Sequence, residues 1–410
     1  MTILLLTHRK IWKRRKLLYS YHFSKFPYFP DEILLLTYAV MNVKKLKPEK
    51  YLRYLMPLNL FGTRRTREIL NQNPTIIPLR EDSNIVRITV HDYNASTIEI
   101  HELTAVKDCF QFLHTDTISW INIDGIRKAD VELVCNHFGV HPLIQEDILS
   151  INQRPKMDEL DNILFCLMNM LYYTTEKNTV EQEQISIILG KNFVLSFQED
   201  ASRDVFNSLR EKLKLTTSRI RQSSTDYLCY TMLDLIVDHY FLVMDKLGEQ
   251  IEDLEEEVVR NSNKRSLAKI NLLRKELIVL KRNIAPVRDL VNGFIRSDSD
   301  LLDDRSTRYF KDIYDHIVQA HDLSESYRDV MINMQDLYIS NVNLKLNEVM
   351  KVMAVVTCVL APATVIGGIF GMNFDIIPYA HQEWGFFLAV GIMLIIPVGM
   401  LWIFKKRGWF

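Results

Sequence analysis

The sequence predicts an α+β membrane protein, with an N-terminal α/β cytosolic domain, a very long stalk helix and two C-terminal transmembrane helices. Two uncharged segments near the C-terminus are each long enough to cross a bilayer. The stretch Arg305–Ala361, just before the proline of the first segment, lacks glycine and proline, and residues 76–202 alternate short β-type runs with helical stretches. With 410 residues, 48% hydrophobic and 25% charged, the chain is too long for a single core and too balanced for disorder.

Residues 1–75 form a basic N-terminal extension without a steady hydrophobic period. Residues 1–67 hold 15 lysines and arginines against three acidic residues, whereas the remaining 35 basic and 48 acidic residues give 68–410 a net charge of −13. This acidic body disfavours nucleic-acid binding and favours a cationic partner. The opening apolar run is too short for a signal peptide, so we expect no cleaved secretory signal. An organelle leader, a disordered extension and an overextended start codon all remain open, and we assign the extension no role.

Residues 76–202 are predicted to form the cytosolic α/β domain. Ile185–Leu189 and Phe193–Gln198 read as a hairpin joined through Gly190. Four further strands are predicted at Ile85–His91, Thr97–Leu103, Thr117–Asn122 and Ile163–Tyr172, and a helix is predicted at Lys128–Phe138. The five cysteines are scattered among apolar residues, which indicates reduced packing residues rather than a metal cluster.

A long helical hairpin is predicted over 203–304. Its helices are expected at Asp226–Arg260 and Lys264–Val291. The first ends in an acidic run over Glu249–Glu257, which is typical of a solvated helix face but would concentrate cations if it faced a pore mouth.

The stalk helix and first membrane span are predicted as one helix over Arg305–Phe370. A helix of this length would extend about 100 Å at ~1.5 Å per residue. A small two-span monomer cannot bury so long a helix, so partners are needed, most simply copies of the same chain. The uncharged segment Val352–Phe370 is close in length to the ~20 residues that cross a hydrocarbon core.

An extracytoplasmic loop over 371–385 and a second span over 386–404 follow. The loop contains no lysine or arginine, whereas Lys345 and Lys351 precede the first span and the basic tail 405–410 follows the second. The positive-inside rule therefore places both termini in the cytosol. A buried hairpin in a soluble core is the alternative, but core helices rarely lack charges over such a length.

A stripe of polar and small residues follows one face of the predicted long helix, where a coiled coil would present leucine and isoleucine. Steps of four and three residues give Asp336, Ser340, Asn343, Asn347, Met350, Ala354, Thr357, Ala361, Thr364 and Gly368. In a membrane such a seam faces protein or water, so it suits either a water-filled axis or close helix packing without a pore. Because the stripe lacks cationic residues and has an acidic cytosolic end, a pore of this kind would suit a hydrated divalent cation.

Several motifs make the sequence similar to the CorA family of magnesium channels. Gly371-Met372-Asn373 directly after the first span resembles the family signature. Further matching blocks, in order, are Trp120-Ile121-Asn122, His141-Pro142-Leu143, Glu146-Asp147-Ile148-Leu149, Gln153-Arg154-Pro155, Asn347–Met353 and the Lys405-Lys406-Arg407 tail. The resemblance covers about 80–410 and implies a funnel-shaped homopentamer in the cell membrane, with the first spans around the pore and the second spans outside them.

The resemblance also implies roles for individual residues. Gly371, Met372 and Asn373 would form the selectivity filter. Met350 and Met353 would form the hydrophobic gate, with Met353 standing where relatives commonly have leucine. Asp336, Asn347 and Thr364 would line the pore, and the helical spacing of the stripe adds Thr357 and Gly368 to this pore lining.

A regulatory Mg²⁺ site is implied between subunits, where Asp147 of one protomer would meet Asp312 of its neighbour, with Glu146 as a second-site ligand. Without the resemblance, Asp312 reads as part of a solvated helix face and His316 as a packing or hydrogen-bonding residue. Mg²⁺ bridging these carboxylates would stabilise a closed ring through its higher affinity for that state.

The function expected is therefore passive Mg²⁺ uptake gated by intracellular Mg²⁺, with Co²⁺ or Ni²⁺ as further ions. A Zn²⁺, Co²⁺ or Ni²⁺ transporter on the same scaffold is one alternative, although the lack of Cys/His clusters favours Mg²⁺. A non-conducting, membrane-anchored oligomer is another. No motif for nucleotide binding or hydrolysis is present in the sequence, so we expect neither an enzyme nor a nucleotide-driven pump.

Overall fold

The computed structural model describes residues 80, 82–372, 382 and 384–409. The predicted basic extension over 1–75 lies outside the described residues, as does most of the loop over 371–385.

A seven-stranded sheet forms the centre of the α/β part, in the order β2-β1-β3-β7-β6-β5-β4. β3 and β7 pair in parallel, and every other neighbouring pair is antiparallel. The strands are β1 (Arg87–Tyr93), β2 (Ile98–Leu103), β3 (Ile118–Asp124), β4 (Lys156–Leu160), β5 (Ile163–Thr174), β6 (Thr179–Leu189) and β7 (Phe193–Gln198). Six of them overlap the predicted strands, which confirms the α/β prediction; β4 was not predicted.

Helices cover both faces of this sheet, because the central strands are apolar on both sides. Phe165 of β5 is buried with α5 (Lys128–His137), α6 (Pro142–Leu149) and the 3₁₀ segment η2 (Val106–Phe112). The next residue, Cys166, points to the opposite face. That face is covered by α7 (Asn207–Lys214), α8 (Thr225–Asn261) and α9 (Lys264–Arg296). The short 3₁₀ segment η3 (Ala201–Arg203) connects β7 to α7, and a second, η4 (Arg219–Gln222), connects α7 to α8.

The helices α8 and α9 form the predicted long hairpin. Asn263 caps α9 by accepting hydrogen bonds from the backbone N–H groups of Arg265 and Ser266 at 2.7 and 3.1 Å. α9 continues to Arg296, beyond its predicted end at Val291. α8 is long and apolar enough to cross a membrane, but 56% of its most apolar 18-residue segment is buried inside the protein, as expected of a core helix.

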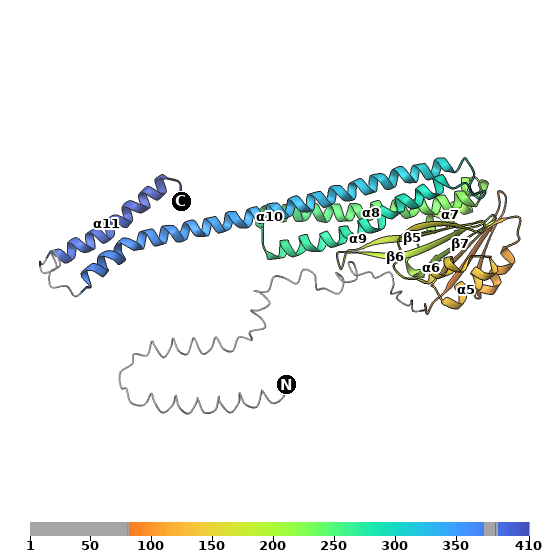
Figure 1. Cartoon of the computed structure of the whole chain (residues 1–410), viewed down its shortest axis with the longest axis horizontal. Helices are drawn as coiled ribbons and strands as arrows, with labels where there is room; N and C mark the ends of the chain where they lie inside the picture. Colours follow the sequence, from red (N-terminus) through yellow and green to blue (C-terminus); the bar gives the residue numbers. More distant parts are fainter. Residues whose placement is uncertain (1–79, 81, 373–381, 383, 410) are drawn as a thin grey trace, which may run out of the picture. The chain divides into compact units, whose positions relative to one another are not determined.

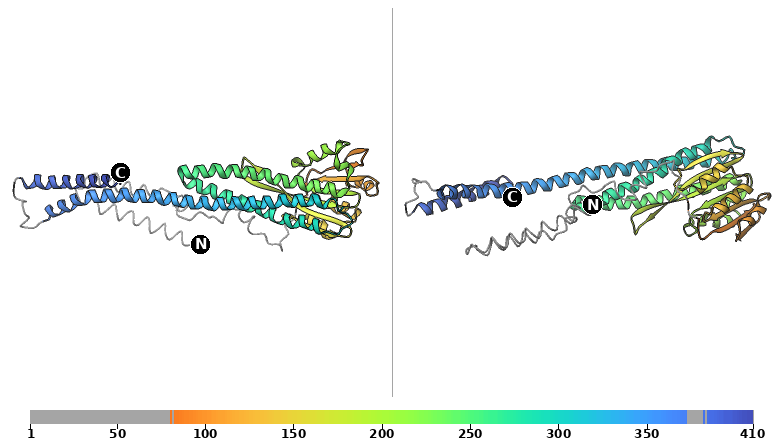
Figure 2. Two further views of the ribbon diagram at one scale, coloured as in Figure 1. Left: turned by 90° about the horizontal axis from the view of Figure 1, so that it is seen from above. Right: turned by 60° about the horizontal axis from the view of Figure 1, so that its bottom comes forward.

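The helix α10 (Thr307–Phe370) is continuous over 64 residues and confirms the predicted stalk helix to within two residues. Its first half packs on α8 and α9 through buried side chains that include Phe310, Ile317 and Met331. Its second half extends beyond the hairpin and lies beside α11 (Gly385–Lys406) (Figures 1 and 2). In each of these two helices, only 6% of the most apolar 18-residue segment is buried. Two long, apolar and exposed helices are consistent with the two predicted membrane spans.

Candidate functional site

The polar and small stripe is exposed along the whole second half of α10. Each of its ten positions from Asp336 to Gly368 is exposed in the single chain. Met350 and Met353, the predicted gate, are 69% and 62% exposed. A large apolar side chain exposed to this degree on a helix that leaves its own domain requires cover from lipid or another copy of the chain.

The stripe and α11 occupy different faces of α10. Val355 is 5% exposed, and Val359, Pro362 and Ile366 are half-buried on the same face. In the described part of the chain, α11 packs along this half of α10, so α11 covers this face. At ~100° per residue, the covered face lies about 150° around the helix from the stripe. The second span therefore covers the back of the first and leaves the stripe free.

Two threonines of the stripe donate their hydroxyl protons to backbone carbonyls of the same helix. Thr357 Oγ1 donates to the carbonyl of Met353 at 2.8 Å, and Thr364 Oγ1 donates to that of Leu360 at 3.1 Å. The hydroxyl oxygens keep free acceptor capacity, because only their protons are used. Such a surface can accept hydrogen bonds from the water molecules around a cation.

The signature motif begins at the end of α10. The N–H of Gly371 donates to the carbonyl of Gly367 at 3.0 Å and that of Met372 to Ile369 at 3.3 Å. A Cβ at Gly371 would lie 3.1 Å from the Gly367 oxygen, which is a tight contact. Asn373, the asparagine of the predicted filter, lies outside the described residues.

The Asp336 end of the stripe is held by the tip of the α8–α9 hairpin. Asn341 donates to the carbonyl of Val258 at 3.1 Å and to Ser262 Oγ at 3.0 Å. Lys345 Nζ donates to Asn261 Oδ1 at 3.1 Å and to the carbonyl of Ser262 at 3.0 Å. These contacts fix α10 about one and a half to two and a half turns before Met350. Sequence reasoning missed them, because they join segments that are far apart along the chain.

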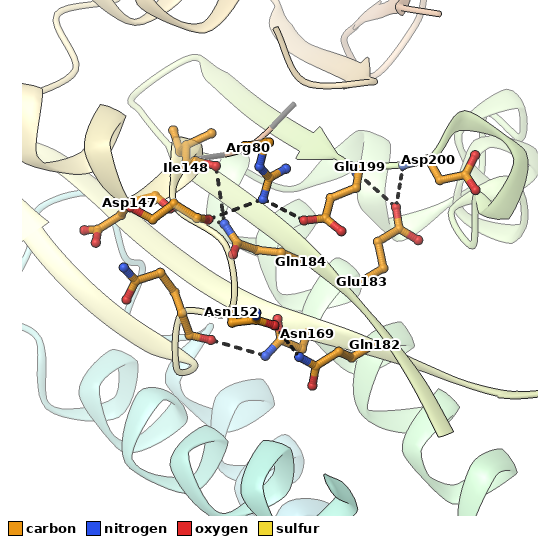
Figure 3. Close-up of polar contacts among 12 residues, drawn as sticks. Arg80, Asp147, Ile148, Asn152, Asn169, Gln182, Glu183, Gln184, Glu199 and Asp200 are labelled. Carbon is orange, nitrogen blue, oxygen red and sulfur yellow. Dashed lines mark hydrogen bonds and ion pairs between the residues drawn. The ribbon is translucent and has the colours of Figure 1, made fainter. Parts of the chain in front are cut away.

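Asp147, the predicted regulatory ligand, lies near the end of α6 at one edge of the domain. Gln184 of β6 donates to the backbone carbonyls of Asp147 and Ile148 at 3.2 and 3.4 Å, which fixes the end of the helix (Figure 3). The Asp147 carboxylate points away from Arg80, whose guanidinium pairs with Glu199 at 2.6 Å. Its own partner is Lys156, whose Nζ lies 2.6 Å from Asp147 Oδ2.

A buried carboxyl lies close to this edge. Glu183 accepts hydrogen bonds from the backbone N–H groups of Glu199 and Asp200 at 3.0 and 2.9 Å (Figure 3). Burial raises the pKa of the Glu183 carboxyl to about 7, although these hydrogen bonds oppose the shift. Glu183 therefore takes up a proton near neutral pH.

The three predicted regulatory residues do not meet within one chain. Glu146 and Asp147 are on α6, and Asp312 is exposed on α10. Among the described residues, the group of three or more potential ligands is Asp234, Asp238 and His316, whose ligand atoms lie within 4.8 Å of one another. The sequence analysis did not single out Asp234 or Asp238 and treated His316 as a packing residue.

Asp312 adds to the negative potential around this group. Burial raises the pKa of Asp234, and the charges of Asp238 and Asp312 raise it further, while His316 opposes them. Carboxylates that repel one another in this way suit a hard divalent cation. The carboxylates of Asp234 and Asp238 on α8 and of Asp312 on α10 are thus chemically able to contribute to a divalent-cation site.

Comparison with known proteins identifies the family. The family described as CorA-like Mg²⁺ transporter protein matches residues 115–406. This chain belongs to the CorA family. The cobalt/magnesium transport protein CorA of Thermotoga maritima is 37% identical over 331 residues, which cover 80% of this chain and 93% of that protein. A second CorA, from Methanocaldococcus jannaschii, is 26% identical over 82% of this chain and 99% of its own length.

The fold agrees with a solved member of the CorA family. The complete structure of the magnesium transporter from Methanocaldococcus jannaschii superimposes with a TM-score of 0.65 at 22% identity, covering 79% of this chain and 98% of that one. This match confirms the family fold, with an N-terminal α/β domain, long helices and apolar C-terminal helices. The relatives named here are transport proteins, and none is described as an enzyme.

Proposed function

We propose that this chain forms a passive Mg²⁺ uptake channel in the cell membrane, with Co²⁺ or Ni²⁺ as further permeant ions. The observation that carries the proposal is the exposed stripe on α10, which faces away from α11 and holds oxygen-bearing side chains at Asn347, Thr357 and Thr364. Its lack of cationic residues and its acidic entrance at Asp336 favour cations over anions.

The stripe needs copies of the same chain to enclose a pathway. Five copies, as the family resemblance implies, would place α10 around a central axis and α11 outside it, with both termini in the cytosol. Rings of Asn347 and Thr364 would hydrogen-bond the hydration shell of Mg²⁺, which the ion gives up reluctantly. Met350 and Met353 would close the axis by excluding water.

The predicted filter, Gly371-Met372-Asn373, would receive the hydrated ion at the outer end. The ion would move with its concentration gradient and the membrane potential, which provides ~4.6 kcal/mol for a divalent cation at ~100 mV. No nucleotide is needed for this movement.

Intracellular Mg²⁺ would regulate the channel through carboxylates that lie on different elements of one chain. Asp147, with Glu146 beside it, would face Asp312 of the neighbouring protomer. A bound Mg²⁺ would offset their repulsion and stabilise the closed ring, and its loss would loosen the ring. Substitution of both Asp147 and Asp312 by Ala should remove the inhibition of flux by cytosolic Mg²⁺; retained inhibition would refute this site.

Mg²⁺ uptake into proteoliposomes tests the transport proposal. Full-length protein is reconstituted under an inside-negative potential, and wild type is compared with Asn373→Ala for Mg²⁺, Co²⁺, Ni²⁺ and Zn²⁺. We expect Mg²⁺ influx that the substitution abolishes. If the folded oligomer conducts none of these ions, a structural role is favoured. If it conducts Zn²⁺ but not Mg²⁺, the transported ion is Zn²⁺ and the proposed substrate is wrong.

A further inference from the structure

The carboxylate of Asp147 already has a cationic partner within its own chain. Lys156 Nζ lies 2.6 Å from Asp147 Oδ2 and 2.9 Å from Asp158 Oδ2. The ammonium thus bridges two carboxylates, one of which is the proposed regulatory ligand.

The backbone holds this pair in place. Lys156 is the first residue of β4 and is paired with Leu167 of β5, while Asp147 is held near the end of α6 by the contact of Gln184 with its carbonyl. Between them the chain reverses through Asn152, which has a φ of 61° and accepts a hydrogen bond from Gln182 at 3.0 Å. The two charged groups therefore meet because both of their elements are anchored to the sheet.

The pair is shielded from solvent more than an ordinary surface ion pair. The side chain of Asp147 is 18% exposed and that of Lys156 is 35% exposed. The two carboxylates at 2.6 and 2.9 Å favour the charged form of the Lys156 side chain over the neutral amine. A contact between charged groups of this kind is stronger than one in full solvent.

We propose that Lys156 is a resident counter-ion that competes with Mg²⁺ for Asp147 and thereby sets the cytosolic Mg²⁺ concentration at which the regulatory site fills. The inference rests on the proposed role of Asp147 as a ligand. Mg²⁺ must either displace the ammonium from Asp147 or bind beside it against charge repulsion. Asp158 gives the displaced ammonium a second acceptor, so it lowers the barrier to exchange without removing the competitor.

Electrostatics sets the size of the effect. A divalent ion and an ammonium about 5 Å apart repel each other, even at the dielectric constant of water, by an amount that corresponds to roughly tenfold in affinity. Lys156→Gln should therefore lower the half-saturating Mg²⁺ concentration about tenfold. Lys156→Arg keeps the charge and should stay within about twofold of wild type.

The test measures binding without transport. Purified full-length protein is unfolded thermally over a Mg²⁺ titration, and the midpoint of the Mg²⁺-dependent stabilisation is compared among wild type, Lys156→Gln and Lys156→Arg. Lys177→Gln is the control, because Lys177, in the turn between β5 and β6, forms a more exposed lysine–carboxylate pair with Glu181 at 3.2 Å. An unchanged midpoint in Lys156→Gln, or an equal shift in Lys177→Gln, would overturn the inference.

A double-mutant cycle separates competition from general electrostatics. Asp158→Asn should weaken Mg²⁺ binding in the wild-type background, because Lys156 then pairs with Asp147 alone, and should have a smaller effect in Lys156→Gln. Equal effects in both backgrounds would contradict competition. If Mg²⁺ stabilises wild type but Asp158→Asn has the same effect in both backgrounds, only the role of Lys156 is refuted. If Mg²⁺ does not stabilise wild type at all, the role of Asp147 as a ligand is refuted as well.

Discussion

Substitution of Met350 by Asn should open the proposed gate. Met350 is 69% exposed in the single chain, and complete burial of a methionine side chain is worth ~1.5–3 kcal/mol. Closing a ring around this position would thus contribute about 1–2 kcal/mol per copy, or roughly 5–10 kcal/mol for five copies. Asn removes this apolar surface and adds groups that bind water, so the closed state should lose most of that free energy.

The assay is Mg²⁺ influx into proteoliposomes that also contain enough internal Mg²⁺ to close the wild-type channel. Since about 1.4 kcal/mol corresponds to a tenfold change in an equilibrium, we expect Met350→Asn to raise influx at least tenfold under closing conditions. Val349→Asn is the control, because Val349 is 60% exposed but lies ~100° around the helix. Equal influx in Met350→Asn and wild type, with both proteins folded, would refute the gate.

Three further predictions concern the α/β part and its contacts with the helical hairpin and α10. The pKa of Glu183 in the folded protein, about 7, lies above its ordinary value of 4.5. The stabilising contribution of this carboxyl is therefore present below pH 4.5 and is lost as the pH rises through 7. Glu183→Gln should remove about 3 kcal/mol of this pH dependence of the free energy of unfolding, as measured by denaturant unfolding between pH 5 and 8. Asn283→Ala should cost about 1–3 kcal/mol in the same assay, because it leaves the buried amide of Asn169 without its 2.8 Å acceptor. Lys345→Ala should speed hydrogen exchange at the hairpin tip around Ser262, and unchanged exchange would show that the contact does not hold the tip.

The long helices could be predicted from the sequence because their signals are local. The absence of glycine and proline over Arg305–Ala361 predicted the stalk to within two residues of its observed start at Thr307. The uncharged segments likewise predicted the spans that became the second half of α10 and α11. Both signals depend on neighbours within a few turns of the same helix, so no tertiary information was needed.

The elements that were missed depend on contacts distant in sequence. β4, Lys156–Leu160, has a charged sequence with no β-branched residue, and it becomes a strand only by pairing with Ile163–Leu167 of β5. α6 is one short helix of eight residues, too short for its period to show. Both elements carry the Asp147–Lys156 pair, which therefore could not be predicted either.

The site was predicted unevenly for the same reason. The stripe follows the period of a single helix, so its exposure on one face of α10 could be anticipated, while its position opposite α11 required the structure. The potential ligands Asp234 and Asp238 lie one turn apart on α8, yet their proximity to His316 arises only from the packing of α8 against α10. Asn373 and the contacts between protomers stay predictions.

Cysteine accessibility along α10 tests the central claim most directly. In a Cys358→Ala background, since Cys358 is the exposed cysteine among the described residues, single cysteines are placed at Asn347, Thr357 and Thr364 on the stripe and at Val356 and Leu360 off it. The reconstituted variants are treated with a small, water-soluble cationic thiol reagent during Mg²⁺ uptake. We predict that modification at the three stripe positions blocks uptake and that the two other positions are unaffected. Block at Val356 and Leu360 without block on the stripe would contradict the proposal that this face of α10 lines the ion pathway.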